Sequence, residues 1–182
     1  MNLPNKLTVL RMILVPVFVV CFYLPFASKM YIAAAVFVLA YITDLLDGQI
    51  ARRNNMVTDF GKLMDPMADK LLTAAAMIML TGIDLISPIA TLITIAREFI
   101  ISALRQISAT KNIVIAAGKI GKMKTLTQCI GITLVLLGNP LFCRWNIPLD
   151  QILIWVSVAL AIWSCADYLV KNLKALKLKE NM

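Results

Sequence analysis

Residues 31–52, YIAAAVFVLAYITDLLDGQIAR, form an apolar run that two aspartates interrupt close to its end. A helix of about 20 apolar residues spans the hydrocarbon core of a bilayer, which is about 30 Å thick. The run is therefore long enough to cross a membrane, and Asp44 and Asp47 would lie inside it. A carboxylate in the bilayer is costly unless another group pairs with it, so these two acids indicate a functional site.

The whole chain shares this apolar character. Its 182 residues are 60% hydrophobic with a mean hydropathy of +0.84, which excludes an ordinary soluble domain of this length. Short connections separate six apolar windows of spanning length, which cover residues 7–24, 31–51, 61–82, 85–106, 123–141 and 149–168. The sequence therefore predicts an all-α integral membrane protein with six transmembrane helices, forming a single domain over residues 1–182.

Basic residues predict the orientation of these helices. Lysines and arginines are concentrated before the first window, after the second, before the fifth and after the sixth, whereas the opposite connections carry only Lys29 and Arg144. By the positive-inside rule, both termini would face the cytoplasm, with the protein in the cytoplasmic (inner) membrane. Topology, anionic lipid headgroups and phosphate substrates explain the net charge of +8, so no nucleic-acid partner is expected.

A second pair of acids lies in the next apolar window. Gly61, Asp65 and Asp69 are spaced by four residues, so they form a stripe on one face of a helix. Asp44 and Asp47 share one face of the preceding helix for the same reason. The hairpin of these two helices would bring all four carboxylates to the cytoplasmic end of the membrane.

Four carboxylates in this arrangement favour a multivalent cation. Carboxylate oxygens are hard ligands, which suit Mg²⁺ or Mn²⁺ better than zinc or copper. Gly48 and Ala51 lie on the same face as the first two acids and leave a hollow in which a bulky group could approach the backbone. Two alternatives stay open, namely a cation site without chemistry and structural salt bridges from the acids to Arg52, Arg97 or Lys70.

The absence of histidine limits the chemistry that the chain can perform. It removes the commonest general base and the commonest zinc ligand. The four cysteines do not replace it, because Cys21, Cys129, Cys143 and Cys165 have no spacing typical of a metal site. If the protein is an enzyme, a carboxylate would have to serve as the base.

Basic residues would lie at a comparable depth on later helices. Arg97 is eight residues before Arg105, about 12 Å along a helix axis, which would bring it to the level of the acids. Its guanidinium would either pair with Glu98 or an aspartate, or bind a phosphate. Lys122 and Lys124 open the fifth window, where a helix N-terminus attracts anions, although a topology signal would explain these lysines equally well.

The acidic pattern D-x-x-D-G-x-x-A-R-x8-G-x3-D-x3-D, over residues 44–69, resembles the signature of the CDP-alcohol phosphotransferases, and every fixed position matches. The six-helix plan is similar to that family as well, so the resemblance covers the whole chain. Segments 4–11, 94–98 and 121–125, together with Arg105, resemble the bacterial phosphatidylglycerophosphate synthases within the family.

This resemblance implies an enzyme of phospholipid biosynthesis that transfers a phosphatidyl group from CDP-diacylglycerol to sn-glycerol 3-phosphate, giving phosphatidylglycerophosphate and CMP. It implies that Mg²⁺ or Mn²⁺ is held at the diphosphate by Asp44, Asp47, Asp65 and Asp69. The CDP moiety would be bound by Asp44, Asp47, Gly48, Ala51, Arg52, Gly61 and Asp65. Asp69 would also be the general base on the acceptor hydroxyl. The acceptor phosphate would be bound by Arg97, Arg105, Lys122 and Lys124. Members of the family are typically homodimers.

Other functions stay open on the sequence. The same chemistry could use another acceptor such as inositol phosphate, whereas serine has no phosphate for the basic residues to bind. A divalent-cation transporter would also place carboxylates within the membrane, but it would not need basic residues at the same end of the membrane. An inverted repeat would favour a transporter, and none is visible in the sequence. A purely structural membrane scaffold would give the aspartates no role.

Overall fold

The computed structural model describes residues 3–53, 59–110, 118–139 and 147–178, and in these ranges it contains helices and no strand. The helices are α1 (Leu3–Cys21), α2 (Lys29–Arg53), α3 (Asp59–Gly82), α4 (Pro88–Thr110), α5 (Lys119–Leu137) and α6 (Leu149–Leu178). Side chains are described for residues 9–43, 70–106, 120–139 and 147–170 and for Ser108. The prediction of an all-α chain with six helices is confirmed for this part of the sequence.

Local chemistry sets several helix ends. α4 begins at Pro88, because a proline in the first turn lacks only an N–H that the helix would leave unbonded. Gly138 ends α5 with a φ of 71°, and its N–H donates to the Val135 carbonyl at 3.1 Å. The Asn139 N–H reaches back to the Leu134 carbonyl at 2.9 Å, which completes a Schellman cap. This cap explains why α5 ends at Leu137, before the end of the apolar window predicted to run to residue 141.

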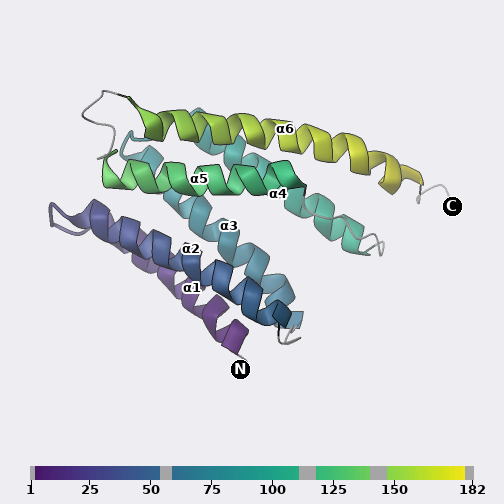
Figure 1. The fold of residues 1–182 in the computed structure, drawn as a ribbon, viewed down its shortest axis with the longest axis horizontal. Coiled ribbons are helices and arrows are strands. Elements are labelled where there is room, and N and C mark those ends of the chain that lie inside the picture. Colours follow the sequence, from purple (N-terminus) through teal and green to yellow (C-terminus); the bar gives the residue numbers. More distant parts are fainter. Residues whose placement is uncertain (1–2, 54–58, 111–117, 140–146, 179–182) are drawn as a thin grey trace.

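The six helices pack as two groups of three (Figure 1). α1 packs against α2 and α3, α6 packs against α5 and α4, and α2 meets α5 where the two groups join. Successive helices alternate in direction. The start of α1, the end of α2, the start of α3 and the end of α6 consequently lie toward one end of the bundle (Figure 1).

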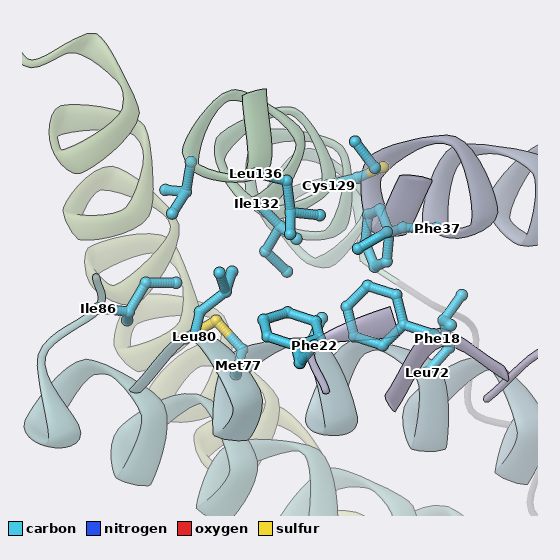
Figure 2. Packing of buried hydrophobic residues seen from close by; sticks show 14 of the residues in the cluster. Phe18, Phe22, Phe37, Leu72, Met77, Leu80, Ile86, Cys129, Ile132 and Leu136 are labelled. Carbon is cyan, nitrogen blue, oxygen red and sulfur yellow. The ribbon is translucent and has the colours of Figure 1, made fainter. Parts of the chain in front are cut away.

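An aromatic cluster holds α1 against α2. Phe18 of α1 and Phe22, which follows the end of α1, lie 5.2 Å apart between ring centroids, at an interplanar angle of 68°, and Phe37 of α2 lies 6.0 Å from Phe18. Leu80 of α3 and Ile132 of α5 join the same buried cluster (Figure 2). The Phe18–Phe37 pair joins α1 to α2, and aromatic pairs contribute about 0.5–1.5 kcal/mol beyond the burial of their area.

Small residues allow close approach between helices. On α2, Ala33, Ala34 and Ala40 are buried, and on α5 the backbone of Gly131 lies directly against α6. A Cβ at position 131 would stand 3.1 Å from Cδ1 of Ile154 and 3.3 Å from its backbone nitrogen. Small residues at helix contacts are typical of membrane proteins, where lipid offers no hydrophobic force to press helices together.

The outer surface of the bundle is apolar. Large exposed apolar side chains occur on every helix, among them Ile13, Leu39, Ile78, Phe99, Met123 and Trp163. Such an extensive apolar surface is unusual for a soluble monomer and fits contact with lipid. In the described part of the chain, the helices long and apolar enough to cross a membrane are Ile120–Leu137 and Leu149–Val170. Shorter apolar segments occur at Val9–Cys21, Lys29–Thr43 and Lys70–Gly82. The other four predicted spans stay predictions.

The contact at Gly131 gives a test of the packing between α5 and α6. We expect Gly131→Val to lower the free energy of unfolding by about 1–3 kcal/mol, because the new side chain must displace Ile154. Gly82→Val is the matched control, since a Cβ there meets nothing within 4 Å. Circular dichroism of thermal unfolding in detergent micelles measures both variants. An equal loss of stability in the Gly131→Val and Gly82→Val variants would contradict this packing.

Candidate active site

The acidic signature lies on two consecutive antiparallel helices. Asp44 and Asp47 are nine and six residues before the end of α2 at Arg53, and Asp65 and Asp69 are six and ten residues after the start of α3. At about 1.5 Å per residue, all four lie about 9–15 Å from the adjoining helix ends. The helices thus bring the four aspartates to one level of the bundle.

The side chains of the acidic signature lie outside the described part of the structure. This applies to Asp44, Asp47, Gly48, Ala51, Arg52, Gly61, Asp65 and Asp69. Their roles in binding metal, binding the nucleotide and accepting the proton stay predictions. In the described residues no group of three acids, cysteines or histidines is placed to hold a metal ion.

The described part of the site is an ionic cluster between α4 and α5. Glu98 Oε1 accepts hydrogen bonds from Arg97 Nη1 at 2.9 Å and from Lys124 Nζ at 2.5 Å. Lys124 is only 2% exposed, and the side chains of Arg97 and Glu98 are 11% and 20% exposed. Charge-assisted bonds of this length are roughly twice as strong as neutral ones. One carboxylate therefore holds two cations from neighbouring helices.

Two further residues position the Arg97 guanidinium. Its Nη2 donates to Ser164 Oγ of α6 at 2.9 Å. Gly121 of α5 lies against the same nitrogen, and a Cβ at that position would stand 3.3 Å from it. Thus α4 supplies the arginine, α5 supplies the space that it occupies, and α6 supplies an acceptor.

Of the four residues predicted to bind the acceptor phosphate, the structure brings two together. Arg97 and Lys124 meet at Glu98, so the pairing of Arg97 with Glu98 left open by the sequence is present. Arg105 is exposed and stacks over the ring of Tyr168, with 5.9 Å from Cζ to the ring centroid. Lys122 is exposed on α5. These last two residues are not part of the ionic cluster.

A buried arginine on α1 was not among the predicted site residues. Arg11 is 1% exposed, and it lies eight residues after the start of α1, a helix that packs against α2 and α3. At about 12 Å from that helix end, it shares the level of the acidic signature. Burying a guanidinium is costly unless anionic or polar groups compensate it. Its depth therefore places a positive charge at the level of the four carboxylates.

Ser164 and Gly121 are the other positions whose contribution the sequence does not reveal. A serine inside a helix ordinarily bonds to a carbonyl of its own helix, so Ser164 gives no signal that it also contacts α4. Gly121 stands among lysines near a helix start, and its contact with Arg97 depends on how α4 and α5 pack. Only the tertiary structure shows both contacts.

Comparison with known protein families matches residues 1–163 to the CDP-alcohol phosphatidyltransferases. A Bacillus subtilis (strain 168) protein named CDP-diacylglycerol–glycerol-3-phosphate 3-phosphatidyltransferase is 38% identical over 188 residues, with 97% of each chain covered. Proteins of the same name from Rickettsia felis and Salmonella typhimurium are 39% and 41% identical over 170 and 174 residues. In both, the match covers 92% of this chain and 93% of the relative.

The ionic cluster predicts a specific cost for losing its carboxylate. We expect Glu98→Gln to lower the free energy of unfolding by about 3 kcal/mol, because two buried cations would lose their shared counter-charge. Asp84→Asn removes the same charge from an exposed turn with a φ of 59°, which asparagine tolerates, and should be near neutral. Denaturant titration of both purified variants in detergent measures the difference. A Glu98→Gln protein as stable as the Asp84→Asn control would show that the cluster contributes nothing to the fold.

Proposed function

The chain belongs to the CDP-alcohol phosphatidyltransferase family, and we propose that it transfers a phosphatidyl group from CDP-diacylglycerol to sn-glycerol 3-phosphate. The products are phosphatidylglycerophosphate and CMP. Relatives named for this reaction are 38–41% identical over more than nine-tenths of the chain, which supports the choice of both substrates. The reaction makes the protein a transferase of phospholipid biosynthesis.

The meeting of Arg97 and Lys124 at Glu98 is the observation that supports the acceptor. Two cations share one carboxylate, so these three side chains together have an excess of one positive charge. Guanidinium and ammonium groups are the usual protein ligands of phosphate oxygens. A phosphorylated acceptor such as glycerol 3-phosphate fits this cluster, whereas an uncharged alcohol would leave its excess positive charge without a second anion. Arg105 and Lys122 would contribute at longer range, from the exposed ends of their side chains.

The acidic signature on α2 and α3 would hold the donor. The family uses divalent metals, and a set of four carboxylates at one level of the bundle suits the hard cations Mg²⁺ and Mn²⁺. Asp44, Asp47, Asp65 and Asp69 would be the metal ligands. When bound, the metal would offset the negative charge of the donor diphosphate. The CDP moiety would be contacted by Asp44, Asp47, Gly48, Ala51, Arg52, Gly61 and Asp65.

The chain's own residues can carry the transfer in one displacement. Arg97 and Lys124 hold the phosphate of the acceptor, which leaves its free hydroxyl to face the donor. Asp69 accepts the hydroxyl proton as the oxygen forms a bond to the lipid-side phosphorus. The bond from that phosphorus to the CMP oxygen breaks, and CMP leaves. Because the protein holds both reactants in line, the reaction between them becomes effectively unimolecular. This accounts for much of the rate enhancement.

The proposed topology has six membrane spans, with both termini in the cytoplasm and the active site open to that side of the cytoplasmic membrane. The exposed apolar side chains on all six helices support contact with lipid along the whole bundle. The alternating directions of the helices support a shared end for the termini and the acidic hairpin. A homodimer is part of the same proposal, on the analogy of the family.

The proposed reaction is tested by CMP release. Purified protein with CDP-diacylglycerol should release CMP only when a divalent metal and an acceptor are both present, and EDTA should abolish the release. Among glycerol 3-phosphate, inositol 1-phosphate, serine and water, we expect glycerol 3-phosphate to support the fastest turnover. Release with serine but not with glycerol 3-phosphate would contradict the acceptor assignment. No release with any acceptor would contradict the proposed enzyme.

The separate roles of the acids can be tested by isosteric amides. Asp69→Asn should lower kcat by at least about 100-fold while CDP binding stays measurable, because only the proton acceptor is lost. Asp44→Asn should weaken metal-dependent CDP binding itself. Asp150→Asn, at the opposite end of the bundle in the first turn of α6, is the control and should keep near-normal turnover. Radiometric turnover and equilibrium dialysis with labelled CDP measure these effects, and an active Asp69→Asn enzyme would refute the general-base role.

A further inference from the structure

Ser164 of α6 makes a contact that goes beyond the usual role of a helical serine. Its hydroxyl donates to the Ala161 carbonyl of its own helix at 3.1 Å. The same oxygen accepts a hydrogen bond from Arg97 Nη2 at 2.9 Å, across the gap between α6 and α4. The residue is 7% exposed, so this bond forms away from solvent. A buried hydroxyl oxygen is thus used as an acceptor for a charged donor.

Ser157, two turns earlier on α6, provides a comparison within the chain. It is fully buried and donates to the Ile154 carbonyl at 2.7 Å, as Ser164 does to its own helix. Within the described residues it makes no further side-chain hydrogen bond. The bond to Arg97 therefore distinguishes Ser164 from a serine that only satisfies its own helix.

The Arg97 guanidinium is oriented from three sides. Glu98 binds Nη1, Ser164 binds Nη2, and the bare backbone of Gly121 lies close to Nη2. Arg97 Nε is buried and has no hydrogen-bond partner among the described residues. A guanidinium is planar, so fixing both terminal nitrogens fixes the direction of its remaining N–H donors. Without Ser164 the plane could rotate about the single remaining bond to Glu98.

We propose that Ser164 is a positioning residue for the acceptor, acting through Arg97 to aim its guanidinium at the acceptor phosphate. This inference rests on the proposed function. The family match ends at residue 163, so the contact comes from a position just outside the matched region. Ser164 does not touch the substrate. It sets the angle at which Arg97 presents its free donors, and its loss weakens binding of phosphate-bearing acceptors.

The expected signature is selective for the acceptor. Ser164→Ala should raise the KM for glycerol 3-phosphate about tenfold, which is the scale of losing one hydrogen bond to a charged group. The KM for CDP-diacylglycerol and the kcat at saturating acceptor should change by less than about twofold, because the acidic signature is untouched. Ser164→Thr keeps a hydroxyl and should restore most of the acceptor affinity.

Ser157→Ala is the matched control, since it removes a buried hydroxyl from the same helix without a bond to α4. It should leave both KM values near those of the unmodified protein. Arg97→Lys supplies a second control, because lysine lacks the two terminal nitrogens of which one bonds to Glu98 and the other to Ser164. Adding Ser164→Ala to Arg97→Lys should then raise the acceptor KM by less than about twofold.

The experiment is steady-state CMP release by the full-length protein in detergent, with glycerol 3-phosphate and CDP-diacylglycerol varied in turn. An acceptor-selective rise in KM for Ser164→Ala, absent from Ser157→Ala, supports the inference. Equal acceptor KM values for the two alanine variants, or an equal rise in both KM values of Ser164→Ala, would overturn it.

Failure of this inference is distinguishable from failure of the proposed function. An unmodified protein that releases no CMP with glycerol 3-phosphate overturns both. An active unmodified protein with indistinguishable alanine variants overturns only the role of Ser164. If Ser164→Ala does not yield folded protein, Ser164→Cys replaces it in the same comparison, because its thiol fills similar space but is a weak acceptor. The same tenfold rise is expected, and its absence overturns the inference.

Discussion

Two cationic side chains from neighbouring helices share one carboxylate inside a bundle whose outer surface is apolar. Glu98 binds Arg97 on its own helix and Lys124 on α5, and this sharing gives an almost fully buried lysine an anionic partner. Breaking such a cluster is costly because it leaves uncompensated charge in a poorly solvated place. This carboxylate links α4 to α5 and brings both cations to one place.

The two groups of helices would bind different substrates in the proposed reaction. In the α1–α3 group, aromatic rings and alanines pack the helices so that α2 and α3 carry the four aspartates at one level. In the α4–α6 group, close approaches at Gly121 and Gly131 bring the cations and their supporting residues together. A donor held by the first group and an acceptor held by the second would meet where α2 packs against α5. Arg11 places a positive charge at the level of the acids, on a helix that carries none of them.

The sequence predicted the six helices well, because each apolar window must form its backbone hydrogen bonds internally to enter a membrane. It was less accurate at their ends. α6 continues to Leu178, ten residues past its apolar window, because a helix does not need apolar residues to continue. α5 instead ends before its apolar window does, because Gly138 caps it with a φ of 71°. Hydropathy does not reveal such a local backbone conformation.

Within the site, Arg97 was singled out as a charge inside an apolar window and Lys124 as a lysine near a helix start, and the structure joins them. The sequence could not tell that Arg105 would stack over Tyr168, or that Lys122 would be exposed outside the cluster, because both depend on how helices rotate against each other. Ser164 and Gly121 could not be found for the same reason. Their contributions are contacts between helices, and neither residue type distinguishes a contact from ordinary helix packing.

An experimental structure of the protein with sn-glycerol 3-phosphate bound would show where the acceptor phosphate is held. We expect its phosphate oxygens about 3 Å from the nitrogens of Arg97 and Lys124, with Glu98 and Ser164 still bonded to Arg97. A phosphate bound instead at the lysines after the sixth apolar window, or anywhere that leaves the Glu98 cluster untouched, would contradict the proposed acceptor site.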